Sequence, residues 1–188
     1  EFGAEEVGER GNPEAAYDAL CALASSVPAG CDGALFPPFL SGASVPRNNP
    51  EARGVLYGLT LKHGRAHFTR AILESIGYML KDILRHVESS GIPIREIHAM
   101  GGGARSDLWL SIKADITGVP IVRMLESETS TLGSAVIQAV KEGAYASLAE
   151  AVAAMVRLGE RFEPDPKNRT VYDEGYRLYE TMYAKLFA

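Results

Sequence analysis

The chain has 188 residues, of which 46% are apolar and 23% charged, and this balance is typical of one globular domain with a sizeable core. Its formal net charge of −5 argues against a nucleic-acid or anionic-membrane surface, because both attract basic proteins. No apolar run is long enough to span a bilayer, and the acidic first residues are unlike a secretory signal. We therefore expect a cytoplasmic protein that binds a small molecule.

Two details of the sequence bear on its compartment and origin. Cys21 and Cys31, with no CxxC motif and no paired ligand set, suit free thiols in a reducing cytosol. The sequence starts at Glu1 rather than at Met, which suggests that it was cut from something longer.

The first third of the chain alternates between a helix and extended segments. Residues 13–27 begin with proline and repeat apolar residues at helical spacing, so they predict a helix. Residues 34–40 are apolar but contain two prolines, which restricts them to an edge strand or an extended segment. A loop rich in Pro and Asn follows over residues 41–54. Residues 54–61 predict a strand in which Gly58 marks a bulge or a close backbone approach.

The longest periodic segment, residues 67–87, predicts a long core helix. Its apolar residues recur at intervals of three and four, at Phe68, Ile72, Ile76, Leu80, Ile83 and Val87. Residues 93–100 then return as a strand. Together with residues 54–61, these segments predict a β–α–β unit of a parallel sheet covered by helices.

Residues 96–109, EIHAMGGGARSDLW, are the stretch that points to function. A short apolar strand is followed by three glycines, which exclude regular structure, and then by a new helical rhythm. Gly101, Gly102 and Gly103 carry no Cβ, so their amides can approach a ligand near the positive end of the next helix. The pattern favours an anionic or nucleotide-like ligand. The alternative is close packing of two elements, since neither the phosphate-loop nor the GxGxxG pattern is present.

The second half of the chain predicts one more strand and three helices. Residues 119–124 predict the strand, and residues 125–140 predict a helix that begins with Ser127 or Thr129 as its cap. The inner face of that helix contains Leu132, Val136 and Val140.

Two further helices are expected at residues 147–157 and 167–186, with the breaker FEPDP between them. In the last helix, tyrosines follow one another at spacings of four, three and four, at Tyr172, Tyr176, Tyr179 and Tyr183. This stripe predicts a packing face rather than a cofactor site.

Several single residues allow a functional and a structural interpretation. His63 and His67 have a metal-binding spacing for one helix face, but no third ligand supports it, so structural roles at the helix start are favoured. Arg53 and Arg65 are candidates for contacting phosphate or sugar, against ordinary ion pairs. Glu74 is expected to be a buried carboxylate bonded to a neighbouring loop rather than a catalytic group.

Residues 54–74, GVLYGLTLKHGRAHFTRAILE, resemble the C-terminal signature of the FGGY carbohydrate kinases. The matching residues are Gly58 and Leu59 and then, after a seven-residue gap, His67, Phe68, Ala71, Ile72, Leu73 and Glu74. The segments FPPFLSG, PEARG, GGGARSDLW and TLGSA also look like their counterparts in the xylulose kinases of this family. The resemblance extends over nearly the whole chain, from about Phe2 to the end.

The resemblance implies an actin-like, ribonuclease-H-like ATPase fold of the α/β class, in which two domains close over ATP and a sugar. Residues 1–188 would be the second, C-terminal nucleotide-binding domain, with a mixed sheet, helices on both faces and an incomplete N-terminal end. The nucleotide-binding residues that it implies are Gly101, Gly102, Gly103, Ser106 and Asp107. Asp107 stands where some relatives carry Asn.

The same resemblance implies ATP and Mg²⁺ as cofactors, and phosphorylation of a ketose such as xylulose, or of a polyol, by the intact protein. The family's catalytic Asp, a general base, and its Gly-Thr-Ser phosphate hairpin both precede the part seen here. No catalytic residue is therefore expected in this chain, which should be inactive without the missing first domain. Dimerisation is usual in relatives, but the C-terminal helices suit internal packing equally well.

One loop departs from the family pattern. Relatives commonly carry SGER, then Pro, then Asp, where this chain has Ala43, Ser44 and Asn49. The loss of these charges leaves room for a rival interpretation, a non-catalytic actin-like module with an assembly or regulatory role.

Overall fold

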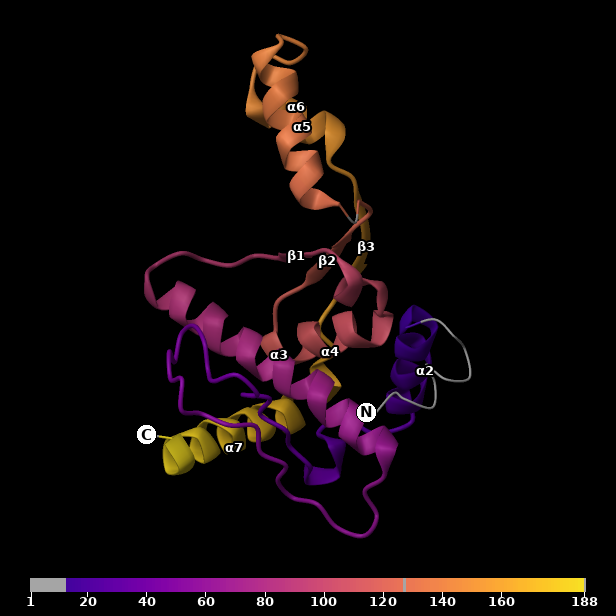
Figure 1. Ribbon diagram of the computed structural model, residues 1–188, viewed down its shortest axis with the longest axis vertical. Coiled ribbons are helices and arrows are strands. Elements are labelled where there is room, and N and C mark those ends of the chain that lie inside the picture. Colours follow the sequence, from indigo (N-terminus) through magenta and orange to yellow (C-terminus); the bar gives the residue numbers. More distant parts are fainter. Residues whose placement is uncertain (1–12, 127, 188) are drawn as a thin grey trace.

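The structure is a computed structural model that describes residues 13–126 and 128–187. Figure 1 shows an elongated molecule in which helices form a lower body, a small sheet lies above them and a helical pair projects from the sheet. The described helices are α2 (Pro13–Ser25), α3 (Arg65–Ser89), α4 (Asp107–Thr117), α5 (Thr129–Lys141), α6 (Leu148–Met155) and α7 (Arg169–Phe187). The strands are β1 (Ile97–Ala99), β2 (Ile121–Met124) and β3 (Leu158–Phe162).

The sheet is mixed and has the strand order β1-β2-β3. β1 runs parallel to β2, with Ile97 opposite Ile121, and β3 runs antiparallel to β2, with Phe162 opposite Ile121. α4 connects β1 to β2, and its residues Leu110 and Ala114 pack into one apolar cluster with Ile121 and Phe162. The expected α/β class with a mixed sheet is confirmed.

The predicted strand over residues 54–61 is wrong, and so is the β–α–β unit built on it. Only Tyr57 forms a bridge there, with Leu35. Gly58 interrupts the extended backbone at a φ of +76°, and a Cβ at this position would lie 2.2 Å from the carbonyl oxygen of Gly33. The close backbone approach expected at Gly58 is confirmed, and the β–α–β unit of the fold is instead β1–α4–β2.

α3 confirms the predicted long helix, but its most buried face is not the predicted one. The apolar residues that set the helical period are only partly buried, and Ile83 is 37% exposed. The most buried line instead carries polar groups at four-residue intervals, at Arg70, Glu74, Tyr78 and Asp82. Tyrosine side chains of α7 cover this line and supply hydrogen-bonding partners for it.

Glu74, which is 2% exposed, is the centre of the first polar contact between α3 and α7. Its Oε1 atom accepts hydrogen bonds from Arg70 Nε at 2.8 Å, from the Tyr172 hydroxyl at 3.1 Å and from the main-chain N of Gly30 at 3.1 Å. Burial raises the pKa of Glu74, although hydrogen bonds from Arg70, Tyr172 and Gly30 oppose that rise. The predicted role of Glu74 as a buried carboxylate bonded to a loop is confirmed.

Asp82 joins α3, α7 and the loop that precedes α3. It accepts hydrogen bonds from the hydroxyls of Tyr176 at 2.5 Å and Tyr179 at 3.3 Å, and from Arg47 Nε at 2.6 Å. The Arg47 guanidinium also lies 4.1 Å from the ring centroid of Tyr183. The tyrosine stripe of α7 is therefore a packing face, as predicted.

The loop with Ala43, Ser44 and Asn49 has anchors of its own. Ala43 and Asn49 exchange two main-chain hydrogen bonds of 2.8 Å, and Asn49 Nδ2 donates to the carbonyl of Phe187 at 2.9 Å. Arg47 adds the contact with Asp82. These contacts hold the loop against α3 and α7 without the charges that the family pattern carries.

Arg47→Ala should lower the free energy of unfolding by roughly 1.5–3 kcal/mol, because it removes a charge-assisted hydrogen bond from a buried carboxylate. Arg85→Ala is the matched control. Arg85 also donates to Tyr176 and to a carboxylate, that of Glu180, but its side chain is 58% exposed, so its loss should cost less than about 1 kcal/mol. Urea unfolding followed by circular dichroism measures both, and equal losses would contradict a buried anchor at Arg47.

α5 begins at Thr129, one of the two residues predicted as its cap. Thr129 is its first helical residue, Glu128 stands at the cap position without a side-chain hydrogen bond, and Ser127 lies outside the described residues. The predicted cap at Thr129 is thus wrong, because its hydroxyl instead donates to the Sδ atom of Met100 at 2.9 Å. This contact ties the start of α5 to the end of β1.

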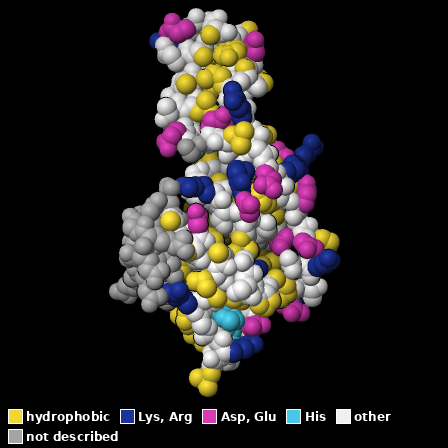
Figure 2. Space-filling model, turned by 90° about the vertical axis from the view of Figure 1, so that its right-hand side faces the viewer, with side chains coloured by type: hydrophobic (Ala, Val, Ile, Leu, Met, Phe, Trp, Pro, Cys, Tyr) yellow, Lys and Arg dark blue, Asp and Glu magenta, His cyan; other side chains and the backbone are white. Residues whose placement is uncertain are grey.

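The projecting pair α5–α6 leaves apolar surface uncovered. Val136 of α5 is buried, as predicted, and so is Ala151 of α6, but Leu132 and Val140 are only partly buried. The exposed large apolar side chains of the pair and of the strand ends below it are Ile137, Leu148, Val152, Leu125 and Leu158. Figure 2 shows apolar side chains gathered on this projection.

The C-terminal part confirms the two predicted helices as α6 and α7. Ser147 caps α6 by accepting a hydrogen bond from the main-chain N of Glu150 at 3.2 Å. β3 lies between these helices and was not predicted. In the described part of the chain, no helix combines the length and apolar character that crossing a membrane requires.

Candidate functional site

The three glycines lie between β1 and α4, as predicted, but they are not free of regular structure. Gly101 has φ 74° and ψ −169°, a combination that is essentially restricted to glycine. Gly102–Arg105 then form a short 3-10 turn. Ser106 follows as the cap of α4, and its Oγ atom accepts a hydrogen bond from the main-chain N of Trp109 at 3.2 Å.

Main-chain amides of this turn are available to a ligand. Within residues 13–126 and 128–187, no hydrogen-bond acceptor is paired with the amides of Gly101, Gly102 or Gly103. A Cβ placed on Gly101 or Gly102 would meet no atom within 4 Å, so neighbouring side chains do not fill this bend. Three unpaired donors on an exposed turn at the start of a helix form a suitable cradle for an electron-rich group.

A cavity of 320 Å³ adjoins the turn. It is lined by Gly101, Ala104, Arg105, Arg123, Met124 and Leu125. The first three of these residues follow β1, whereas the last three lie at the end of β2. The cavity thus lies at the carboxyl ends of two parallel strands, where open α/β sheets usually bind ligands. Its volume falls at the lower end of the range for small-molecule sites.

Arg123 holds one wall of the cavity in place, and two neighbouring carboxylates offset its positive charge. Its Nε atom donates to the carbonyl of Ala104 at 2.9 Å, its Nη2 atom is hydrogen-bonded to Asp107, and its Nη1 atom lies 3.7 Å from a carboxylate oxygen of Glu160. The guanidinium also lies 5.1 Å from the ring centroid of Phe162. Arg123 therefore connects β2 to the glycine turn and to the start of α4.

The predicted site residues gather at one place, although their roles differ. Gly101 lines the cavity and Gly102 faces open space, whereas Gly103 packs against the indole of Trp109. Ser106 is buried and serves as the helix cap. Asp107 is 70% exposed beside Arg123. Whether these residues hold a nucleotide stays a prediction.

Sequence reasoning missed the lining residues Arg105, Arg123, Met124 and Leu125. A signal for three of them was available. Arg123 and Met124 end the strand predicted over residues 119–124, and Leu125 follows it. If this strand pairs in parallel with the strand that precedes the glycine turn, the carboxyl ends of the two strands come together.

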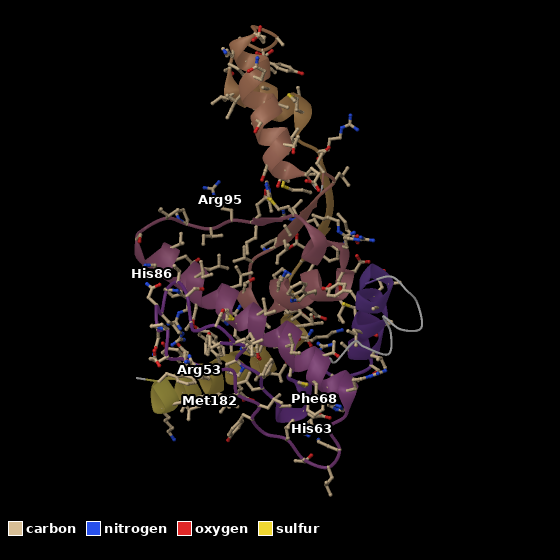
Figure 3. All side chains as sticks on the ribbon, viewed as in Figure 1. Arg53, His63, Phe68, His86, Arg95 and Met182 are labelled. Carbon is tan, nitrogen blue, oxygen red and sulfur yellow. The ribbon has the colours of Figure 1, made fainter. Side chains whose placement is uncertain are left out.

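Arg53 and the two histidines lie elsewhere. Figure 3 places Arg53 and His63 below α3, on the opposite side from the sheet. Arg53 donates to the carbonyls of Pro50 and Ala52, and His67 lies 3.5 Å from a carboxylate oxygen of Asp32. Among the residues that the structure describes, no three His, Cys, Asp or Glu side chains are grouped to hold a metal ion.

A β1–α4–β2 unit with an open glycine turn is an arrangement typical of nucleotide-binding domains of the α/β class. The C-terminal-domain model of the FGGY family of carbohydrate kinases matches residues 3–142, and the chain belongs to this family. The family resemblance predicted from the sequence is confirmed.

Individual relatives agree with this assignment. The chain is 34% identical over 167 residues to the xylulose kinase of Staphylococcus epidermidis, covering 89% of this chain and 34% of the relative. It is 41% identical over 143 residues to the glycerol kinase of Citrifermentans bemidjiense, covering 76% and 28%. The solved structure of xylulose kinase from Rhodospirillum rubrum matches with a TM-score of 0.82 at 35% identity, covering 93% and 35%. The chain thus spans about a third of the length of these relatives.

Proposed function

We propose that this chain is the C-terminal, nucleotide-binding domain of an ATP-dependent carbohydrate kinase that phosphorylates a ketose such as xylulose, or a polyol. Family membership supports the reaction class, and relatives named xylulose kinase and glycerol kinase support this range of acceptors. The observation that carries the proposal is the cavity beside three glycine amides that have no acceptor among the residues described by the structure.

The wall of the cavity favours the adenosine part of the nucleotide over the triphosphate. Met124 and Leu125 are apolar, and the charge of Arg123 is compensated by Asp107 and Glu160. A planar base and its ribose suit the apolar part of this wall, and Arg105 adds a second positively charged side chain that can face the negatively charged nucleotide. In this proposal the amides of the glycine turn would donate hydrogen bonds to the ribose or to a phosphate of the nucleotide.

Mg²⁺ fits this arrangement as a companion of ATP rather than as a resident of this wall. Mg²⁺ usually keeps several waters and binds one or two carboxylates together with substrate phosphates. The carboxylate of Asp107, the first residue of the helix that follows the turn, is engaged with Arg123. The metal would therefore be held by phosphate oxygens and by groups outside this wall, where it neutralises charge on the transferred phosphoryl group.

The acceptor side of the reaction belongs to other parts of the protein. The residues that line the cavity include no carboxylate and no histidine, so this wall offers no general base for the sugar hydroxyl. In our proposal that base comes from a part of the intact protein outside these 188 residues, since the chain spans only about a third of the length of its relatives. The uncovered apolar side chains of α5 and α6 agree with further polypeptide packing on this domain.

A coupled ADP-release assay with a panel of pentuloses and glycerol tests the proposal. The intact protein should turn over one of these acceptors with Mg-ATP, whereas the 188-residue chain should show no measurable turnover. Turnover by the 188-residue chain would overturn the division of roles. Failure of the intact protein to bind ADP in calorimetry would overturn the nucleotide assignment, and binding without turnover of any acceptor would favour the non-catalytic module.

A further inference from the structure

Trp109 packs against Gly103 of the glycine turn and contacts two other helices, α3 and α2. Its Nε1 atom donates to the carbonyl of Leu73 in α3 at 3.2 Å. Its ring centroid is 6.3 Å from that of Tyr17 in α2, and the ammonium of Lys113 lies 3.7 Å from the indole centroid. The indole is therefore held on several sides, and its orientation is fixed relative to the helical body.

The indole leaves no room for a side chain at Gly103. A Cβ on Gly103 would lie 2.6 Å from Cζ3 and 3.2 Å from Cε3 of Trp109. Gly103 has no left-handed backbone, in contrast to Gly101, so the backbone conformation does not require glycine at this position. Close contact with Trp109 is thus the reason that the structure shows for glycine there.

Trp109 is also tied to the start of α4 through its main chain. Its N–H donates to Oγ of Ser106, the residue that ends the glycine turn and caps the helix. One residue therefore fixes the turn in two places, by its ring against Gly103 and by its amide on Ser106. The amides of the turn have no acceptor among the described residues, so the turn is held by these two contacts of Trp109 and by the hydrogen bond from Arg123 to the carbonyl of Ala104.

We propose that Trp109 is a positioning residue of the nucleotide site, whose indole, anchored on Leu73, sets the place of Gly103 and so aligns the amides of the turn with the ligand. This inference depends on the proposed function, because it assumes that the turn binds a nucleotide. Trp109 itself does not line the cavity, so it acts through Gly103 and Ser106.

A double-mutant cycle on the intact protein tests the proposal, with the dissociation constant of ADP measured by calorimetry. Gly103→Ala should weaken ADP binding by about tenfold, because the added methyl group pushes the turn away from the indole. Trp109→Leu should weaken ADP binding by roughly threefold, because the indole that holds Gly103 in place is lost. In the double variant the smaller side chain makes room for the methyl group, so affinity should return to about that of Trp109→Leu alone.

Two variants control for general loss of stability. Gly77→Ala creates a contact of the same length, 2.6 Å from Cδ1 of Ile116, but at the far end of α4. Leu108→Ala removes a side chain that, like Trp109, packs against the main core. Both should lower thermal stability and leave the ADP dissociation constant within about twofold of the unsubstituted protein.

The outcomes separate the two proposals. If the unsubstituted protein does not bind ADP, the nucleotide assignment fails, and the role of Trp109 fails with it. If the unsubstituted protein binds ADP but the effects of Gly103→Ala and Trp109→Leu simply multiply, the positioning role alone is overturned. An equal loss of ADP affinity in Gly77→Ala would also overturn the positioning role, because the loss of affinity would then result from lower stability of the whole domain. In the kinase assay, a higher KM for ATP at unchanged kcat in Trp109→Leu would support positioning.

Discussion

Glu74→Ala should lower the free energy of unfolding by about 3–5 kcal/mol, the usual cost of removing one partner of a buried ion pair. The substitution removes the counter-charge of Arg70, a residue that is 7% exposed in the folded protein. It also removes the acceptor for the Tyr172 hydroxyl and for the main-chain N of Gly30. Urea unfolding followed by circular dichroism measures the loss.

Two further variants make the Glu74 prediction specific. Glu88→Ala changes an exposed carboxylate on the same helix, so stability should change by no more than about 0.5 kcal/mol. The double variant Arg70→Met with Glu74→Leu leaves no unpaired charge, so it should recover much of the stability lost in Glu74→Ala. A double variant less stable than Glu74→Ala would show that packing, rather than an unpaired charge, dominates at this position.

The polar line of α3 shows where periodicity fails as a guide. The spacing of apolar residues located the helix, but it assigned the inner face to residues such as Ile76 and Ile83, which are only partly buried or exposed. Arg70 and Asp82 are the residues that a hydrophobicity pattern assigns to solvent. Their burial depends on tyrosine hydroxyls about a hundred residues later in the chain, and no local rule encodes such a pairing.

The sheet was predictable only in part, for a related reason. β1 and β2 carry short apolar runs, so both strands were found. β3 has the sequence LGERF, in which charged residues interrupt the apolar ones, and its identity comes from pairing with β2. Conversely, residues 54–61 have strand-like composition, but Gly58 at positive φ limits them to an isolated bridge.

The sequence predicted one side of the candidate site, the glycine turn, but not the opposite side. The glycine turn could be found from sequence because three glycines after an apolar strand are a local signal. The opposite wall, at Arg123, Met124 and Leu125, lies about twenty residues further on and meets the turn only through the parallel pairing of β1 and β2. Glu160, whose carboxylate offsets the charge of Arg123, lies on β3, and the sequence pattern did not predict this strand.

Gly101→Ala should weaken ADP binding by about tenfold or more, because the backbone at φ 74° and ψ −169° costs roughly 1–3 kcal/mol for any residue with a Cβ. A Cβ at this position meets no atom within 4 Å, so the added methyl group itself causes no clash. The turn is exposed and can relieve the strain by moving. That movement turns the unpaired amides away from the cavity, and calorimetry with ADP measures the loss of affinity.

Gly118→Ala is the control: it introduces similar backbone strain at a glycine that lies away from the candidate site. Gly118 also has a positive φ, 73°, but it lies at the opposite end of α4, where it ends the helix. Alanine there should lower stability by about 1 kcal/mol and leave the ADP dissociation constant unchanged. If Gly101→Ala bound ADP as tightly as the unsubstituted protein, the amides of the turn could not be the donors that hold the nucleotide. Strain at the turn matters for binding only if the turn is where the ligand lies.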